Sequence, residues 1–166
     1  KRGDMPGALF TSTDPKRNGL SYHSLLSTYK YDLGELSSQG VYLIHVADAA
    51  IAPAKDTVHV CKDGEMRVLN HAQLIFNRDS AYHLVVDADL LVKGGDSYTG
   101  KGFYDFTGHP DKPQRLLLDD ISTQTLTQSG NQVITVAKGS VDDKASFTLS
   151  PAFGFAGKVR VEGNQR

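Results

Sequence analysis

The sequence predicts an all-β protein whose antiparallel strands form a sandwich, a jelly roll or a stack of similar β rungs. Short apolar runs rich in β-branched residues recur roughly every 10–15 residues, and helical patterns are almost absent from residue 41 onward. Three phrases also repeat a polar residue, Ala, any residue, and Ile or Leu, at residues 48–51, 71–74 and 87–90. Stacked rungs would place the small Ala of one phrase beside that of the next.

About eleven strands are expected from residue 41 onward, after a first one within residues 21–33. That segment is ambiguous, because its Leu and Tyr residues fit helical spacing as well as one side of a strand. Its Tyr and Thr content, and a turn expected at residues 37–40, favour a strand. The later strands are expected at residues 41–46, 57–61, 65–69, 72–76, 82–92, 102–106, 114–118, 123–127, 132–137, 145–149 and 158–161.

The chain is expected to contain one folded unit. Residues 1–20 are predicted to form a flexible N-terminal segment, because Pro6, Pro15 and Asn18-Gly19 interrupt any regular period. Residues 21–166 are predicted to form a single β domain, because no internal stretch has the composition of a linker. The chain begins with Lys rather than Met, which leads us to expect a fragment of a longer polypeptide.

The composition argues against a nucleic-acid partner, an internal disulfide and a transmembrane segment. The 166 residues carry a net charge of −1 with mixed signs, which gives no electrostatic reason to expect a nucleic-acid partner. Cys61 is the single cysteine, so no internal disulfide is expected, and its apolar neighbours predict a buried thiol. No stretch approaches the roughly 18 apolar residues that a membrane helix needs, so no transmembrane segment is predicted.

Histidine spacing is the first candidate for a metal site. Stacked strands could bring imidazoles from neighbouring rungs together around Zn²⁺ or Cu²⁺. The chain has no His-x-His pair and no second cysteine, and its Asp residues lack the spacing of a calcium loop. We therefore predict no metal and no other cofactor. The histidines concerned lie 14, 12 and 12 residues apart, at His45, His59, His71 and His83.

No catalytic residue is predicted, because no serine has the Gly-x-Ser-x-Gly context of a nucleophile elbow and Cys61 is expected to be inert. Aromatic residues gather in two Gly-rich segments, residues 98–106 and 153–155. Exposed rings there could stack on a sugar or contact another ligand, whereas their alternation with small residues favours burial. The candidate ligand contacts are Tyr98, Tyr104, Asp105 and Phe153.

The order of several phrases resembles a segment of very long, exported, uncharacterised proteins of Bacteroidota. The resemblance spans roughly residues 20–162. It implies a periplasmic or extracellular location in the bacterial envelope, and it implies no activity and no site residue. The phrases are Val46-Ala47-Asp48-Ala49-Ala50-Ile51-Ala52-Pro53, Tyr82-His83 with Asp87-Ala88-Asp89, residues 98–106, residues 147–153 and Gly157-Lys158-Val159.

The loose β repeats are also similar in style to the bridge-forming jelly-roll proteins of lipopolysaccharide transport. Those proteins have a V-shaped stack of strands with an apolar interior that holds acyl chains. The similarity implies an interior lined by aliphatic side chains. Suitable inward-facing candidates are Val41, Leu43, Leu74, Phe76, Leu84, Val86, Leu116 and Leu118.

The expected function is a non-catalytic structural or binding module of a bacterial cell-envelope protein. Uniform β patterning, balanced charge and the lack of a catalytic signature favour this interpretation. A jelly-roll carrier of lipid or lipopolysaccharide is one alternative, and a carbohydrate-binding domain is another. The expected partners are other parts of the parent chain or envelope proteins, with lipid or glycan as further candidates.

Overall fold

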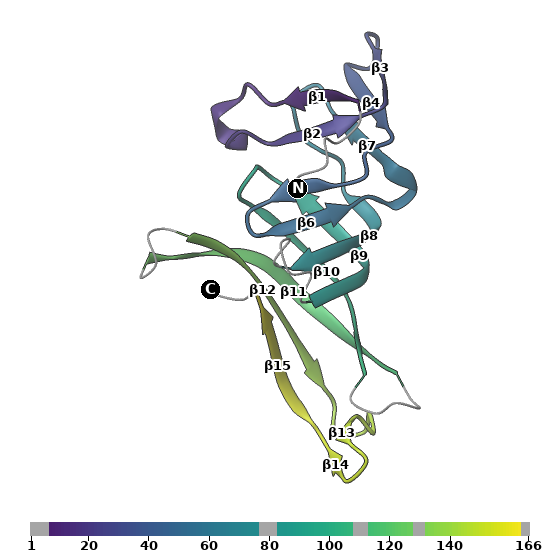
Figure 1. The fold of residues 1–166 in the computed structure, drawn as a ribbon, viewed down its shortest axis with the longest axis vertical. Coiled ribbons are helices and arrows are strands. Elements are labelled where there is room, and N and C mark those ends of the chain that lie inside the picture. The colour runs from purple at the N-terminus through teal and green to yellow at the C-terminus, as the bar shows by residue number, and fades with distance from the viewer. Residues whose placement is uncertain (1–6, 77–82, 108–112, 128–131, 164–166) are drawn as a thin grey trace.

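The computed structural model describes residues 7–76, 83–107, 113–127 and 132–163 (Figure 1). These residues form an all-β, antiparallel fold, which confirms the predicted class, with fifteen strands and two short 3-10 helices. The strands are β1 (Ala8–Thr11), β2 (Ser21–Ser24), β3 (Leu26–Lys30), β4 (Glu35–Gln39), β5 (Ile44–Val46), β6 (Ala49–Ala52), β7 (Thr57–Val60), β8 (Leu69–Phe76), β9 (His83–Val92), β10 (Tyr98–Phe106), β11 (Gln114–Leu126), β12 (Gln132–Val141), β13 (Thr148–Ser150), β14 (Phe153–Gly154) and β15 (Gly157–Glu162). The helices are η1 (Pro15–Arg17) and η2 (Ala54–Asp56).

Ten strands form one continuous antiparallel sheet in the order β1-β2-β5-β6-β8-β9-β10-β11-β12-β15. A three-stranded sheet, β3-β4-β7, lies beside the upper part of this sheet in Figure 1, and the hairpin β13-β14 lies at the opposite end. Successive strands are stacked along the long axis, so the molecule is elongated. Among the described residues, neither helix has the length and hydropathy that a membrane crossing requires.

The backbone bends sharply between β2 and β3 and within β8 and β9. In the upper rungs the bend interrupts the strand, so that only Leu25 separates β2 from β3. In β8 and β9 the strand continues through the bend, at His71 and Asp87, whose φ angles of 55° and 52° are left-handed. The pairing of β8 with β9 shifts register on both sides of Ala72. Each of these bends is therefore a β-bulge, which inserts one residue and turns the strand.

Small residues fill the inside of these bends. Ala72 and Ala88 are paired across β8 and β9, and both are fully buried. In the neighbouring strand β10, Gly102 occupies the corresponding position. A Cβ atom on this residue would lie 2.6 Å from Val85 Cγ1 and 2.9 Å from Ala88 Cβ. The expected stacking of Ala on Ala is thus present for two phrases. It is absent for residues 48–51, which begin in the turn between β5 and β6.

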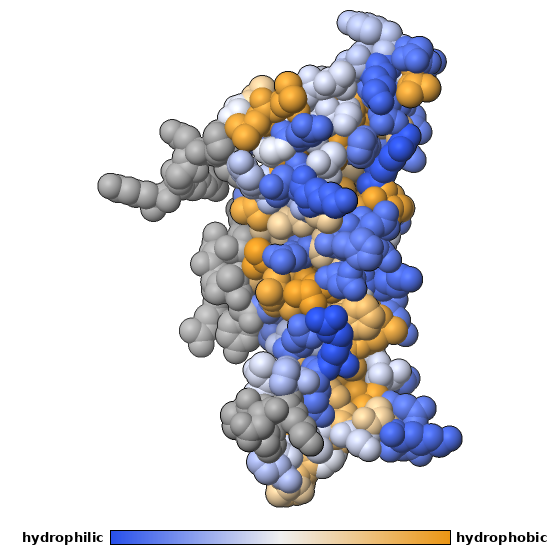
Figure 2. Space-filling view, turned by 90° about the vertical axis from the view of Figure 1, so that its right-hand side faces the viewer, coloured by the Kyte–Doolittle hydropathy of each residue, from blue (hydrophilic) through white to orange (hydrophobic). Residues whose placement is uncertain are grey.

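Charged side chains accompany the bends on the outside of the sheet. Exposed pairs of this kind contribute between about 0 and 1 kcal/mol each, so they keep the surface polar more than they stabilise it. Figure 2 shows blue hydrophilic patches along the whole length of one side, with orange hydrophobic patches between them. The pairs are His71 with Asp87, Lys101 with Asp89 at 3.9 Å, and Lys138 with Asp120 at 3.2 Å.

Two local predictions about the N-terminal part are wrong. Residues 37–40 were expected to form a turn, but β4 occupies Glu35–Gln39 and the turn precedes it at residues 31–34. The serines suit a strand here because the Ser38 hydroxyl is hydrogen-bonded to the Tyr22 hydroxyl at 3.2 Å. Residues 8–11 of the predicted flexible segment form β1, which pairs with β2, whereas residues 1–6 lie outside the described residues.

The bulges also explain which expected inward side chains point outward. Leu84 is 44% exposed and Val86 is half-buried, whereas Val85 and Ala88 are fully buried. The alternation of β9 is shifted by one residue at Asp87, so a single period of two cannot describe the whole strand. Of the remaining candidates, Leu43 is half-buried and the buried ones are Val41, Leu74, Phe76, Leu116 and Leu118.

Candidate functional site

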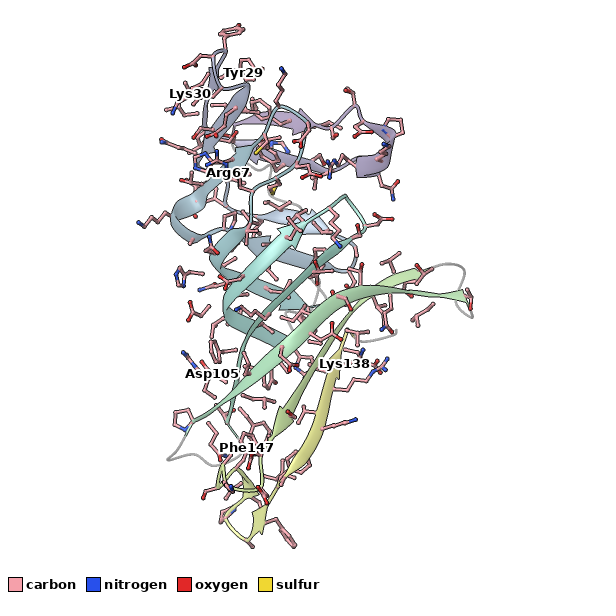
Figure 3. All side chains as sticks on the ribbon, turned by 180° about the vertical axis from the view of Figure 1, so that it is seen from behind. Tyr29, Lys30, Arg67, Asp105, Lys138 and Phe147 are labelled. Atoms are coloured by element: carbon pink, nitrogen blue, oxygen red, sulfur yellow. The ribbon has the colours of Figure 1, made fainter. Side chains whose placement is uncertain are left out.

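An apolar groove with a volume of about 400 Å³ opens near the end of the molecule that carries β13 and β14. It lies between the paired ends of β9, β10 and β11 on one side and β15 on the other. Phe147, which marks this end in Figure 3, forms part of its wall. The groove is lined by His83, Tyr104, Phe106, Leu116, Phe147, Leu149, Phe155, Lys158, Val159, Arg160 and Val161.

Gln114 holds the segment that carries Phe147 against the sheet. Its amide nitrogen donates to the Thr148 carbonyl at 2.6 Å, and its amide oxygen accepts from the Thr148 N–H at 2.8 Å. The side chain thereby pairs with the backbone as a neighbouring strand would. Phe147 is then packed between two rings, with centroid distances of 5.5 Å to Phe106 and 6.4 Å to Phe155. The aromatic wall is therefore fixed by hydrogen bonds as well as by packing.

One hydrogen-bonded polar pair lies in the wall of the groove. His83 Nδ1 and the Tyr104 hydroxyl are 3.0 Å apart, and their rings meet edge to face. Burial lowers the pKa of His83, which favours a neutral imidazole at neutral pH. Two exposed cations from β15, Lys158 and Arg160, also line the groove, and Arg160 is paired with Glu162 at 2.8 Å. The groove thus combines apolar walls with a few polar groups of fixed position.

The four predicted ligand contacts do not form one site. Tyr104 lines the groove, whereas the ring of Phe153 is 70% exposed on β14 and is not part of the lining. Asp105 is exposed and forms a bidentate pair with Arg115 at 2.8 and 3.2 Å, and this pairing lowers the pKa of Asp105. Tyr98 is fully buried, so it belongs to the core and its ring is closed to a ligand.

The histidines of the candidate metal site make separate contacts. His59 lies 3.1 Å from Glu35, His71 contacts Asp87, and His83 contacts Tyr104. In the part of the chain that the structure describes, no three His, Cys, Asp or Glu side chains are close enough to share a metal ion. Cys61, expected to be buried, is half-buried.

Sequence reasoning identified Tyr104 as a ligand contact and Leu116 as an inward-facing residue, but it missed most of the groove. Phe106 and Phe155 belong to the two Gly-rich aromatic segments, whereas Phe147, Val159 and Val161 carry no signal beyond an ordinary short strand. Comparison of the chain with family models, with curated proteins and with solved structures finds no match.

Proposed function

We propose that this chain is a non-catalytic binding module of the bacterial cell envelope, and that its aromatic groove takes the acyl chain of an amphipathic lipid. The groove is the observation that carries the proposal. Its volume of about 400 Å³ lies within the range of roughly 300–1,000 Å³ that is typical of small-molecule sites. The envelope location rests on the resemblance to exported proteins.

The lining of the groove suits a hydrocarbon chain better than a polar ligand. Each methylene group that leaves water for an apolar wall contributes about 0.8 kcal/mol. The rings of Phe106, Phe147 and Phe155 and the side chains of β15 supply that wall. Lys158 is exposed and belongs to the lining, so an acidic headgroup is favoured over a cationic one.

A carbohydrate-binding function has weaker support. Sugar faces stack on exposed rings that have polar groups beside them. Phe153 is exposed, but Tyr98 is buried and Tyr104 is hydrogen-bonded within the wall of the groove. Of the three aromatic residues predicted as contacts, only Phe153 is open to such stacking, so the groove favours enclosure of an apolar chain over an open stacking platform.

Titration with a fluorescent long-chain fatty acid tests the proposal. Val161 is half-buried in the groove wall, so Val161→Trp should fill the groove and raise the dissociation constant at least about tenfold. Leu117→Trp is the matched control, because Leu117 is an exposed residue of β11 outside the lining. If the two variants bind the fatty acid with equal affinity and have unchanged circular dichroism, the acyl chain does not bind in this groove.

A further inference from the structure

A second pocket of about 290 Å³, with a more polar lining than the apolar groove, lies beside the three-stranded sheet. Figure 3 shows Arg67, which lines it, in the upper part of the molecule, and Phe147 of the apolar groove in the lower part. The two sites are therefore separate. The polar side chains that line this pocket are Lys55, Thr57, His59, Arg67 and Asn70.

A buried carboxylate holds two of these side chains in place. Glu35 Oε1 lies 3.1 Å from His59 Nδ1, and Glu35 Oε2 accepts from the Arg67 guanidinium. Glu35 is buried, so the two contacts occupy both of its oxygens and restrain both partners. The thiol of Cys61 and the carboxylate of Glu35 raise the pKa of Arg67, which therefore stays charged.

The strand register explains why these groups meet. The Arg67 N–H donates to the His59 carbonyl at 2.9 Å, which places the two residues opposite each other on the hairpin that β7 begins. On the other side of β7, His59 is paired with Ser37 of β4, two residues after Glu35. All three side chains consequently share the outer face of the sheet.

Lys55 reaches the pocket from a strained turn. Lys55 and Asp56 have φ angles of 56° and 51°, so two successive residues other than glycine are left-handed. The Thr57 hydroxyl donates to the Lys55 carbonyl at 2.9 Å, and the Val41 N–H donates to the Asp56 carbonyl at 2.9 Å. Backbone strain of this kind costs of order 1–3 kcal/mol per residue and is concentrated at ligand-binding sites. A turn held in this conformation places the lysine at the pocket wall.

We propose that this pocket binds the phosphate group of a phosphate monoester. None of the described residues that line it is acidic, whereas Lys55, His59 and Arg67 are basic. The Arg67 side chain is 58% exposed, so its fork of N–H donors is open to an oxyanion even while one nitrogen contacts Glu35. The Thr57 hydroxyl and the Asn70 amide are neutral groups within the same lining.

The phosphate monoester group can belong to a free small molecule or to the headgroup of a membrane lipid. Both ligands carry the same group, so the experiment tests one ligand of each kind. Isothermal titration with glycerol 3-phosphate represents the free ligand, and glycerol is its uncharged control. Sedimentation with vesicles that contain phosphatidic acid represents the lipid, and phosphatidylcholine vesicles are the control.

Lys55→Asn tests the site with little risk to the fold. Asn tolerates the left-handed conformation of Lys55, and the substitution leaves the buried Glu35 contacts intact. Lys16→Gln removes the same charge at an exposed position outside the pocket. We expect Lys55→Asn to weaken binding at least about fivefold in the arm where the wild type binds, and Lys16→Gln to leave it unchanged.

Arg67→Lys supplies a second, independent variant. It keeps the charge beside Glu35 but loses the planar fork, so binding should weaken while the thermal midpoint stays close to the wild-type value. The proposal is overturned if the wild type binds neither phosphate probe more tightly than its control. Equal binding by Lys55→Asn and Lys16→Gln in both arms overturns it as well. The comparison of the variants does not bear on the apolar groove, because its lining contains none of the substituted residues. The glycerol 3-phosphate arm does not bear on it either, because that ligand carries no acyl chain.

Discussion

His83 and His71 lie in environments that shift their pKa values in opposite directions. Burial lowers the pKa of His83 below the ordinary value of 6.5. Hydrogen bonding and charge attraction from Asp87 raise the pKa of His71, which is exposed. The unfolded chain therefore binds a proton at His83 more readily than the folded protein does, and the reverse holds at His71.

These shifts predict how stability depends on pH. The contribution of His83 to the free energy of unfolding is complete above the unfolded pKa near 6.5 and is lost as the pH falls below it. The contribution of His71 is present below 6.5 and is lost as the pH rises through the pKa of His71 in the folded protein. We expect His83→Gln to lose less stability than the wild type on acidification, and His71→Gln to lose more. Urea unfolding between about pH 5 and about pH 8 measures the slope of the free energy of unfolding against pH for each variant. Slopes equal to that of the wild type in both variants would contradict the assignment.

At the scale of the strand, the bulges decide which side chains face the core. In β8 the buried positions pass from Ala72 to Leu74 in a step of two residues, but from Leu69 to Ala72 in a step of three. The same three-residue step separates Val85 from Ala88 in β9 and Leu118 from Ile121 in β11. The repeated phrase of a polar residue followed by Ala coincides with this step in β8 and β9. Its polar residue, His71 or Asp87, has a left-handed backbone conformation, and the Ala that follows is the first buried residue after the bulge.

The backbone conformation at Asp87 can be tested by paired substitutions. Asp87→Val and Asp87→Gly both remove the contact with His71, so their difference reports the left-handed φ of 52°. We expect the Val variant to be less stable than the Gly variant by roughly 1–2 kcal/mol in urea unfolding. Leu91, an exposed residue in the regular part of β9, is the control position, where Val should be the more stable of the two. The same order at both positions would argue against a left-handed bend.

At the scale of the whole molecule, one carboxylate ties the β5–β6 turn to β12, which is separated from it by four strands of the sheet. Asp48 Oδ1, in the turn between β5 and β6, accepts from the Thr135 N–H at 2.8 Å and from the Thr135 hydroxyl at 2.6 Å. The Tyr98 hydroxyl in turn donates to Thr135 Oγ1 at 2.5 Å. The contact spans 87 residues of sequence and connects the β5–β6 turn with β12 and β10. It limits how far β12 and β15 can separate from the upper rungs.

Removal of this carboxylate should destabilise the protein. Asp48→Ala leaves the N–H of the buried Thr135 without its acceptor, which costs about 1–3 kcal/mol in the free energy of unfolding. Asp120→Ala is the control, because it removes an exposed carboxylate whose pair with Lys138 is worth about 0–1 kcal/mol. Hydrogen exchange should also accelerate in β15, where the Gly163 N–H beyond the strand end donates to the Thr135 carbonyl. If Asp48→Ala costs no more than Asp120→Ala, the contact does not hold the β5–β6 turn to β12.

Little of the candidate sites could be predicted from the sequence. Tyr104 was identified because aromatic residues gather in the Gly-rich residues 98–106. Phe147 and Val161 reach the same groove only because Gln114 anchors one segment and β15 pairs with β12. Glu35, His59 and Arg67 likewise meet through strand pairing, and Glu35 lies in a segment next to an expected turn.

The sequence by itself determined the β class and the stacking of small residues in two of the three repeated phrases, because these depend on local side-chain shape and on a period of two. It did not determine the strand lengths, because β11 joins the two strands expected at residues 114–118 and 123–127. The tertiary structure decided the register across each bulge, the apolar groove and the cluster around Glu35. Those features arise from pairing between strands that are distant in the chain, and one inserted residue is enough to exchange the buried and exposed faces.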